Sequence, residues 1–184
     1  MKFRPVQRTA AVGAAVLLLA LLPAAAAARG EGDTLELAVK ATYLYKLAPF
    51  VTWPAEPAGT AAPLPICVQG TDPFGPLLDR AMAGQSVGGR PVVVRRVARL
   101  DPDTGCAIAY VSGSAVQSQA QALAAVERAP VLTVTDAARG PTRGIVHLLL
   151  DGGKVRFAID TAKADEAGLA ISSKLLALAV VVRP

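Results

Sequence analysis

Apolar residues recur at helical spacing over residues 35–48, and this pattern predicts an amphipathic helix. The predicted buried face consists of Leu37, Ala41, Leu44 and Ala48. The side chains expected beside this face or away from it are Lys40, Tyr45 and Lys46. Asp33 and Glu36 form a variant capping box at the predicted start, and Pro49 stops the helix because proline lacks the backbone N–H that a helix needs.

Short apolar runs alternate with amphipathic segments along the rest of the chain. The pattern predicts strands at 64–69, 91–97, 107–111 and 131–135 and helices at 74–83, 115–128 and 161–167. Asp151-Gly152-Gly153 separates the apolar runs 144–150 and 154–159, and such a turn predicts a β-hairpin. A loop rich in Pro, Ala and Gly is expected at 55–63, and a final segment covers 172–181.

The alternation of strands with helices predicts an α/β fold. Strands joined through helices run parallel to one another, whereas the two strands of a hairpin are antiparallel. We therefore predict a single three-layer domain with a mainly parallel sheet, helices that flank it and an antiparallel hairpin at one edge. The pattern contains no internal repeat and no sign of a second domain.

The first 28 residues follow the order of charged, apolar and small residues that is typical of a secretory signal peptide. The charged start consists of Lys2, Arg4 and Arg8. The apolar run 10–22 is shorter than the roughly 20 residues that a membrane anchor needs, and the small residues 24–28 suit a cleavage site. We therefore predict cleavage after Ala26 or Ala28, export to the periplasm and a mature domain at 29–184.

Export changes the charge balance of the protein. The leader holds three of the 19 Lys and Arg residues and none of the 14 Asp and Glu residues, so 16 basic and 14 acidic residues remain. This small excess indicates no particular partner. The clearest basic cluster consists of Arg95, Arg96 and Arg99, and few aromatic residues accompany it, whereas proteins that bind single strands stack bases on aromatic rings. We therefore expect no nucleic acid partner.

Cys67 and Cys106 are the two cysteines of the chain: Cys67 lies in the predicted strand 64–69, and Cys106 directly precedes the predicted strand 107–111. An even number of cysteines in an exported protein favours a disulfide. A redox pair is more often arranged as C-x-x-C, and a zinc site needs histidines or more cysteines, whereas this chain has one histidine. We therefore predict a structural disulfide.

Few residues have the chemistry of a catalytic or metal site. His147 lies in a predicted apolar strand without a nucleophile nearby in the sequence, so we interpret it as a packing or edge residue. The run 172–174 lacks the S-x-x-K spacing of a serine–lysine acylase, and the glycines of 84–89 lack the spacing of a nucleotide-binding loop. We predict that the protein is not an enzyme and that it binds no cofactor or metal.

Acidic residues beside predicted helix starts allow two interpretations. Asp72-Pro73-Phe74-Gly75 follows a strand and precedes a helix, which is a position where a helix N-terminus can bind an anion. The same four residues also suit a turn with a helix cap, and we prefer this interpretation. Asp160, Asp165 and Glu166 are likewise interpreted as capping residues and surface charge.

Six blocks of sequence, in order, carry a resemblance to a known family. They are 39–46 with 50–54, 64–68 with 72–75, 87–92, 130–136, 153–160 and 167–176. Together they span nearly all of the mature chain. No single block is decisive, but their common order resembles the YfiR-like family.

The resemblance implies a periplasmic regulator without catalytic activity, which represses an inner-membrane diguanylate cyclase by binding its periplasmic sensing domain. Such a repressor limits cyclic di-GMP signalling and thereby biofilm formation, and an outer-membrane lipoprotein sequesters it. The resemblance also implies a homodimer and disulfides, with Cys67 and Cys106 matching one pair of the family, whereas a second pair present in some members is missing. The membrane partner stays open between a cyclase, a histidine kinase and another envelope receptor.

The partner is expected to contact an apolar patch with a polar rim. We place this patch on the hairpin and the C-terminal region, where Phe157 offers an aromatic anchor. The predicted partner-binding residues are Arg156, Phe157, Glu166, Ile171, Lys174 and Leu175. For Phe157 and Leu175, ordinary packing in the core is an equally good interpretation.

Two other functions stay open. A small-ligand sensor or carrier would have a sizeable pocket with converging polar groups near Asp72 or Asp136, because open α/β sheets place crevices at the carboxyl ends of their strands. A hydrolase would need a nucleophile within reach of a base, which the single His147 makes doubtful.

Overall fold

The computed structural model describes residues 23–54 and 62–184, with side chains from residue 32 onward. The chain divides into the unit Met1–Thr34, whose described part is helical, and the unit Leu35–Pro184, which contains the sheet. The charged start and the apolar run of the predicted leader lie outside the described residues, as does the part 55–61 of the predicted loop.

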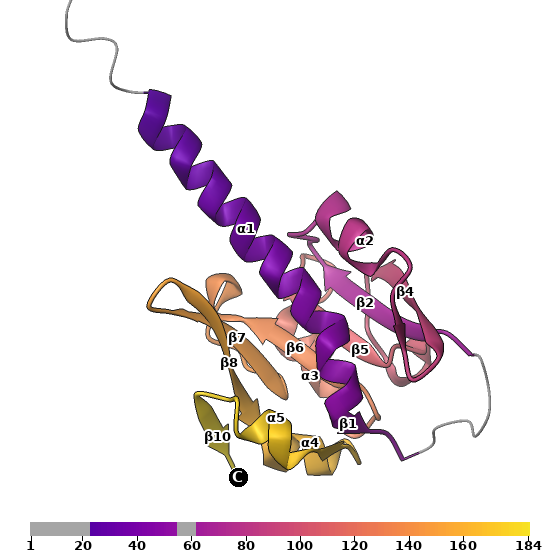
Figure 1. Cartoon of the computed structure of the whole chain (residues 1–184). Helices are drawn as coiled ribbons and strands as arrows, with labels where there is room; N and C mark the ends of the chain where they lie inside the picture. The colour runs from indigo at the N-terminus through magenta and orange to yellow at the C-terminus, as the bar shows by residue number, and fades with distance from the viewer. Residues whose placement is uncertain (1–22, 55–61) are drawn as a thin grey trace, which may run out of the picture. The chain divides into compact units, whose positions relative to one another are not determined.

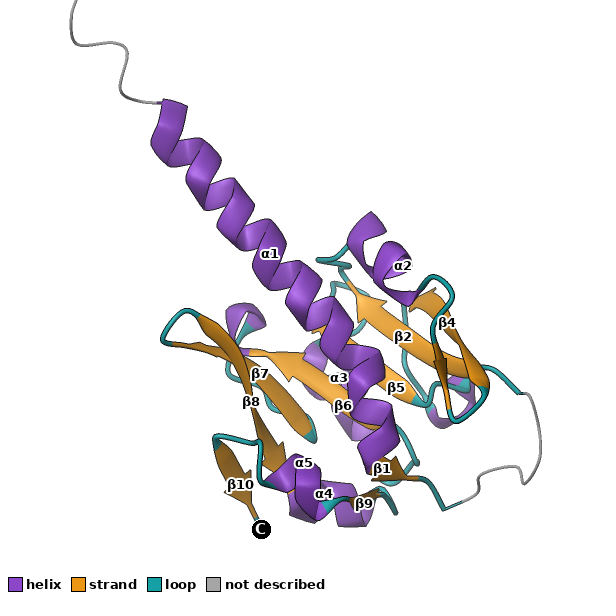
Figure 2. Cartoon of the chain, in the orientation of Figure 1, coloured by secondary structure: helices purple, strands orange, loops and turns teal. Residues whose placement is uncertain are grey.

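Helices and strands alternate as the sequence predicts (Figure 1, Figure 2). The α-helices are α1 (Pro23–Leu47), α2 (Pro76–Met82), α3 (Gln119–Ala125), α4 (Thr161–Glu166) and α5 (Ser173–Leu176). The strands are β1 (Val51–Thr52), β2 (Leu64–Gly70), β3 (Ser86–Val87), β4 (Arg90–Val97), β5 (Ile108–Gly113), β6 (Leu132–Asp136), β7 (Val146–Asp151), β8 (Lys154–Asp160), β9 (Ala170–Ile171) and β10 (Val181–Arg183). Short 3-10 helices cover Ala48–Phe50, Pro102–Thr104 and Ala137–Arg139.

The main sheet has eight strands in the order β10-β8-β7-β6-β5-β2-β4-β3. The pairs β2–β4, β2–β5, β5–β6, β6–β7 and β8–β10 are parallel, whereas β7–β8 and β3–β4 are antiparallel. The predicted α/β class with a mainly parallel sheet and an antiparallel hairpin is therefore confirmed. The hairpin turns at Asp151-Gly152-Gly153, as predicted, and β10 lies outside it.

The sheet is covered on both faces, which gives the predicted three layers (Figure 2). On one face, Ile66 and Val68 of β2 pack with Leu44 of α1 and with the apolar side chains of α2, α4 and α5. On the other face, Cys67 packs with Val126, beside α3. Alternate residues of one strand thus enter different cores, because successive side chains point to opposite sides of a sheet.

Helix α1 starts earlier than the sequence predicts. The helix is continuous from Pro23, so Asp33 and Glu36 lie inside it and the predicted capping box at that position is wrong. Alanine is the strongest helix former, and the alanines of 24–28 extend the helix toward the N-terminus. Of the predicted buried face, Ala41, Leu44 and Ala48 are buried, and Leu37 is half-buried and packs against the core.

The structure contains short elements that the sequence pattern did not reveal. Strand β1 pairs with β9 in a separate antiparallel sheet, and β3 pairs with β4 across the turn at Gly88 and Gly89. Helices α2 and α3 are shorter than predicted, and Ser118 caps α3 in a capping box with Gln121. The final segment forms α5 and then β10, which pairs in parallel with β8.

Two glycines permit a close approach at the carboxyl end of β2. The register of β2 against β5 shifts between Gln69 and Gly70. Gly70 has a φ of +82°, and a Cβ at this position would lie 2.4 Å from the carbonyl oxygen of Gly113. Both the backbone conformation and the lack of space therefore require glycine at position 70.

Candidate functional site

The predicted partner-binding residues come from four elements of the C-terminal half. Arg156 and Phe157 lie on β8, Glu166 ends α4, Ile171 lies on β9, and Lys174 and Leu175 lie on α5. The exposed members are Arg156, Glu166 and Lys174, and Ile171 is half-buried. These four side chains are accessible to a partner, and their role in binding stays a prediction.

Phe157 and Leu175 are core residues, since their side chains are only 4% and 3% exposed. The ring of Phe157 packs edge-on against Tyr43 of α1, with 5.9 Å between the ring centroids. The core-packing interpretation therefore describes both residues. Phe157 can affect a surface contact only indirectly, by packing against Tyr43, whose side chain is half-buried.

The structure places a groove of about 390 Å³ along the outer side of α1. Its lining consists of Ala38, Val39, Thr42, Tyr43 and Lys46. Sequence reasoning missed this groove, because it considered only the stripe of α1 that faces the core. The spacing of Leu35, Val39 and Tyr43 at i, i+4 and i+8 is a second apolar stripe and could have revealed it.

The β7–β8 hairpin extends the apolar surface beyond α1. Leu148 pairs with Phe157 and Leu150 pairs with Val155, so these four side chains share one face of the hairpin. The first pair belongs to the core on the α1 side, whereas Leu150 is 48% exposed. We call Leu35, Val39, Tyr43, Leu150 and Val155 the α1–hairpin surface.

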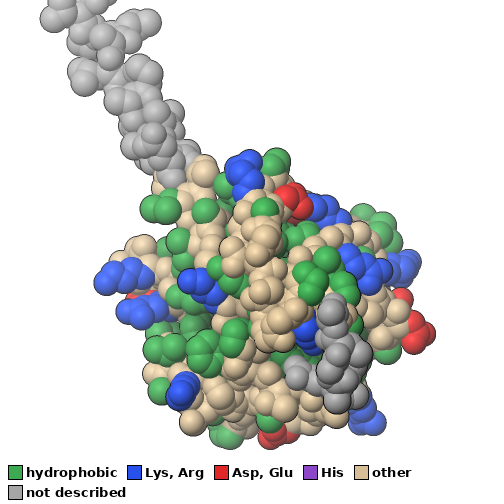
Figure 3. Space-filling model, turned by 45° about the vertical axis from the view of Figure 1, so that its right-hand side comes forward, with side chains coloured by type: hydrophobic (Ala, Val, Ile, Leu, Met, Phe, Trp, Pro, Cys, Tyr) green, Lys and Arg blue, Asp and Glu red, His purple; other side chains and the backbone are tan. Residues whose placement is uncertain are grey.

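Exposure and charge at the α1–hairpin surface suit a protein contact. Leu35 is 67% exposed and Val39 is 36% exposed, so both present apolar area to solvent. Lys46 lines the groove and Arg156 is exposed on β8. On the face drawn in Figure 3, groups of hydrophobic side chains lie among Lys and Arg side chains. An apolar patch with a cationic rim has the composition of a protein-binding site.

A buried ion pair fixes α1 on the sheet beneath this surface. The Lys40 ammonium donates a hydrogen bond to Asp136 Oδ2 at 2.6 Å and also pairs with Glu36 one helical turn earlier. Lys40 is 1% exposed, so the expectation that it lies beside or away from the buried face is wrong. Its burial depends on Asp136, because a buried charge requires a partner of opposite sign.

Tyr110 completes the surroundings of Asp136. Its hydroxyl donates a hydrogen bond to Asp136 Oδ2 at 3.3 Å, and the backbone N–H of Ala138 donates to Oδ1 at 2.9 Å. Burial raises the pKa of the Tyr110 phenol far above its ordinary value, and the negative charge of Asp136 adds to this shift. Tyr110 therefore remains a neutral donor, and both oxygens of the buried Asp136 carboxylate are engaged by groups of the chain itself.

Asp72 is also occupied by contacts within the chain. Its Oδ1 accepts hydrogen bonds from the backbone N–H groups of Phe74 and Gly75, and its Oδ2 accepts one from Arg96 Nε at 2.7 Å. Arg96 also binds Asp79, and these hydrogen bonds lower the pKa of the Asp79 carboxyl. The turn-and-cap interpretation thus describes Asp72, and neither Asp72 nor Asp136 lines the groove on α1, the cavity at the end of α3 or the small cavity beside His147.

His147 is buried in β7, where the sequence places it as a packing residue. Its Nδ1 forms a hydrogen bond with the Thr135 hydroxyl at 2.9 Å, and that hydroxyl accepts a hydrogen bond from the N–H of Gly144. Burial lowers the pKa of His147, and the charge of Arg143 lowers it further. The part of the chain that the structure describes contains no cluster of three His, Cys, Asp or Glu residues that could hold a metal.

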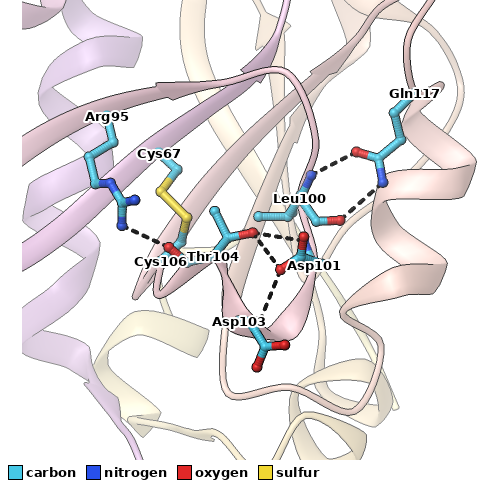
Figure 4. The surroundings of a disulfide bond; sticks show 8 residues. All are labelled: Cys67, Arg95, Leu100, Asp101, Asp103, Thr104, Cys106 and Gln117. Atoms are coloured by element: carbon cyan, nitrogen blue, oxygen red, sulfur yellow. Dashed lines mark hydrogen bonds between the residues drawn. A yellow bond between two sulfur atoms is a disulfide. The ribbon is translucent and has the colours of Figure 1, made fainter.

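The predicted disulfide is present between Cys67 of β2 and Cys106, which precedes β5 (Figure 4). The loop that it closes is held by further contacts: Arg95 Nη1 donates to the carbonyl of Thr104, and the side-chain amide of Gln117 forms two hydrogen bonds with the backbone of Leu100. Both cysteines are buried, which protects the bond from solvent.

A protein-family model matches most of the chain. The model of the YfiR/HmsC-like family matches residues 37–180, which is well over half of the chain and includes both cysteines and the α1–hairpin surface from Val39 onward. Curated proteins provide no match. The YfiR-like family consists of periplasmic regulators of diguanylate cyclase signalling rather than enzymes. Within the described residues, every helix is too short or too polar to cross a membrane. The chain belongs to the YfiR/HmsC-like family.

Proposed function

We propose that the protein is exported to the periplasm by a cleaved signal peptide and there binds and represses the sensing domain of an inner-membrane diguanylate cyclase. The observation that carries this proposal is the family match over residues 37–180. The bond between Cys67 and Cys106 supports it, because disulfides persist in oxidising compartments such as the periplasm.

The proposed contact is the α1–hairpin surface together with the four accessible predicted residues, which are Arg156, Glu166, Ile171 and Lys174. A few well-packed side chains, among which Tyr, Trp and Arg are enriched, provide most of the binding free energy at protein interfaces, and charged side chains at the rim set specificity. Tyr43 is held by Phe157, so its ring is positioned before the partner arrives. A positioned ring loses little conformational entropy on binding.

Repression requires that the protein bind the inactive conformation of the cyclase more tightly than the active one. A change from mostly active to mostly inactive cyclase needs a difference in binding free energy of about 3 to 5 kcal/mol. Sequestration by an outer-membrane lipoprotein would relieve repression by competing for the free protein. We include a homodimer in the proposal, as the family resemblance implies.

The test uses the full chain expressed with its leader, purified from the periplasm, and the periplasmic sensing domain of an inner-membrane diguanylate cyclase from the same organism. We expect saturable binding by calorimetry and a fall in cellular cyclic di-GMP when the protein is expressed. Val39→Asp places a charge in the groove and should weaken binding at least about tenfold.

Val116→Asp is the matched control, because Val116 is 50% exposed and lies outside the α1–hairpin surface. This variant should bind as the unchanged protein does. Equal binding by both variants would exclude the groove as the contact. Unchanged cyclic di-GMP on expression of a protein that reaches the periplasm would contradict the proposed repression, and capture of a histidine kinase instead would replace the cyclase as the target.

A further inference from the structure

A second cavity lies on the opposite side of the sheet, at the end of α3. It has a volume of about 200 Å³. Its apolar wall consists of Leu123, Val126, Val131 and Ile145. A dry cavity of about 150 Å³ can hold a benzene molecule, so this volume suits one aromatic ring or a short aliphatic chain with a small polar group.

Most of the cavity lining belongs to the α3 face, whereas Ile145 packs in the core under α1 and Lys163 comes from α4; no residue of the α1–hairpin surface lines it. Val131 packs in the core under α3, whereas its neighbours along β6, Leu132 and Val134, pack in the core under α1. Thr133 continues the alternation of Val131 and lines the cavity. A ligand in this cavity would leave the proposed partner groove free.

Three ionisable side chains line the cavity together with the apolar wall: Glu127, Arg143 and Lys163. The Lys163 ammonium is engaged, since it donates to the carbonyl oxygen of Arg143 at 2.6 Å and lies 3.9 Å from Asp160. The guanidinium of Arg143 is different: among the described residues, no acidic side chain forms an ion pair with it. Arg143 therefore brings to the cavity a positive charge that forms no ion pair with the described acidic side chains, although Glu127 lines the same cavity.

We propose that this cavity binds a small organic monocarboxylate, with its apolar body between α3 and β6 and its carboxylate on Arg143. A guanidinium binds a carboxylate through two parallel hydrogen bonds, which fixes the orientation of the ligand. Glu127 opposes a second negative charge, so a monoanion is favoured over a phosphate or a dicarboxylate. This inference goes beyond the proposed function and does not depend on it.

Benzoate is the probe, because it combines one ring with one carboxylate. The experiment measures binding to the purified full-length export product by calorimetry and by NMR, at fixed salt and pH 7. We expect saturable binding of benzoate at millimolar concentration or below, weaker binding of the neutral benzyl alcohol and none of the cationic benzylamine. Absence of saturation at about 10 mM benzoate, or equal binding of all three compounds, would overturn the proposal.

Two pairs of variants locate the site. Arg143→Gln removes the charge and should weaken benzoate binding about tenfold, whereas Arg128→Gln, at an exposed position outside the lining, should leave it unchanged. Ala124→Phe places a ring at the cavity and should abolish binding, whereas Ala125→Phe on the same helix should not. Both positions on α3 are exposed, so neither substitution disturbs the core.

Benzoate binding that survives both Arg143→Gln and Ala124→Phe would place the ligand elsewhere and refute the site. The groove variant Val39→Asp separates this inference from the proposed function. It should bind benzoate normally, whereas its affinity for the periplasmic domain of the cyclase should fall. Loss of benzoate binding in Val39→Asp, with the fold intact by circular dichroism, would contradict the assignment to the α3 face.

Discussion

Lys40 of α1 and Asp136 at the end of β6 form an ion pair in which both side chains are almost completely buried. The two residues are 96 positions apart in the chain, and the ammonium lies 2.6 Å from the carboxylate oxygen. A buried pair of this kind adds little net stability compared with apolar residues, but removal of one partner leaves an uncompensated charge. The pair therefore fixes the position of α1 on the sheet, and with it the groove that α1 carries.

We expect Lys40→Met to destabilise the fold by about 3 to 5 kcal/mol, because Asp136 is then left buried without its cation. Denaturant unfolding followed by circular dichroism measures this change. Lys46→Met is the matched control on the same helix, and its exposed position predicts a change within about 0.5 kcal/mol.

The double variant Lys40→Met with Asp136→Asn tests the cause of this loss. Asparagine removes the charge and keeps an oxygen for the N–H of Ala138. The double variant should be more stable than the sum of the two single losses predicts, with a coupling of about 1 to 3 kcal/mol. Simple additivity would mean that the pair does not interact in solution.

We expect reduction of the Cys67–Cys106 bond to lower the free energy of unfolding by about 3 to 4 kcal/mol. The bond spans 39 residues, and the chain-entropy model gives this value for a loop of that length. Thermal unfolding with and without a reductant measures the loss, and Cys67→Ala with Cys106→Ala should reproduce it without any reductant. An unchanged melting temperature after complete reduction would contradict the prediction.

The lowered pKa of His147 predicts that the folded protein loses stability in mild acid. Because burial lowers its pKa in the folded protein, the unfolded chain, with an ordinary value of about 6.5, takes up the proton first as the pH falls. Its contribution is therefore complete above about pH 6.5 and declines as the pH falls from there toward the folded pKa. The charges that act on the ring, besides its burial, are those of Arg143, Asp136, Arg183 and Lys163.

Unfolding experiments between about pH 7.5 and about pH 5.5 should show this decline, and His147→Gln should flatten it. Glutamine does not titrate and still offers polar atoms toward Thr135. If the variant and the unchanged protein had the same slope over this range, the protonation of His147 would not be its cause.

The close approach of Gly70 to Gly113 predicts that alanine at position 70 is costly. Gly70→Ala adds a Cβ that meets the Gly113 backbone at 2.4 Å and forces alanine into a positive φ, so we expect a loss of about 3 kcal/mol or more. Gly152→Ala is the control, because its φ is also positive but its Cβ would meet open space, and it should cost about 1 kcal/mol. Equal losses in denaturant unfolding would show that the β2–β5 end relaxes around the added carbon.

The sequence predicted the elements whose formation depends on neighbouring residues. The helix that buries Leu44 and the hairpin at Gly152 follow from local periodicity and turn chemistry, and both are present. The two-residue strands β1 and β9 exist only through their partner across the chain, so no local pattern marks them. The burial of Lys40 could not be predicted for the same reason, since its partner lies on another strand.

The same distinction between local patterns and long-range contacts applies to the candidate site. Arg156 and Phe157 were predicted to lie on a strand, and both lie on β8. Which of the two faces the core depends on the register of the sheet. Phe157 faces inward and contacts Tyr43, a residue that the prediction did not include. The groove on α1 was missed because an exposed apolar stripe on a helix becomes informative only when the opposite stripe is known to be buried.

The bond between Cys67 and Cys106 also bears on how the chain reaches this structure. Parallel strands are slow to form, because each pairing closes a long loop and loses chain entropy before any contact compensates for it. The bond links β2 to the residue that precedes Ala107 and β5, and these two strands are neighbours in the sheet. Strand β4 lies beside β2, and β6 lies beside β5. An oxidised chain that has been unfolded thus retains one long-range closure, and it starts its search for the native topology with the central strands already near each other.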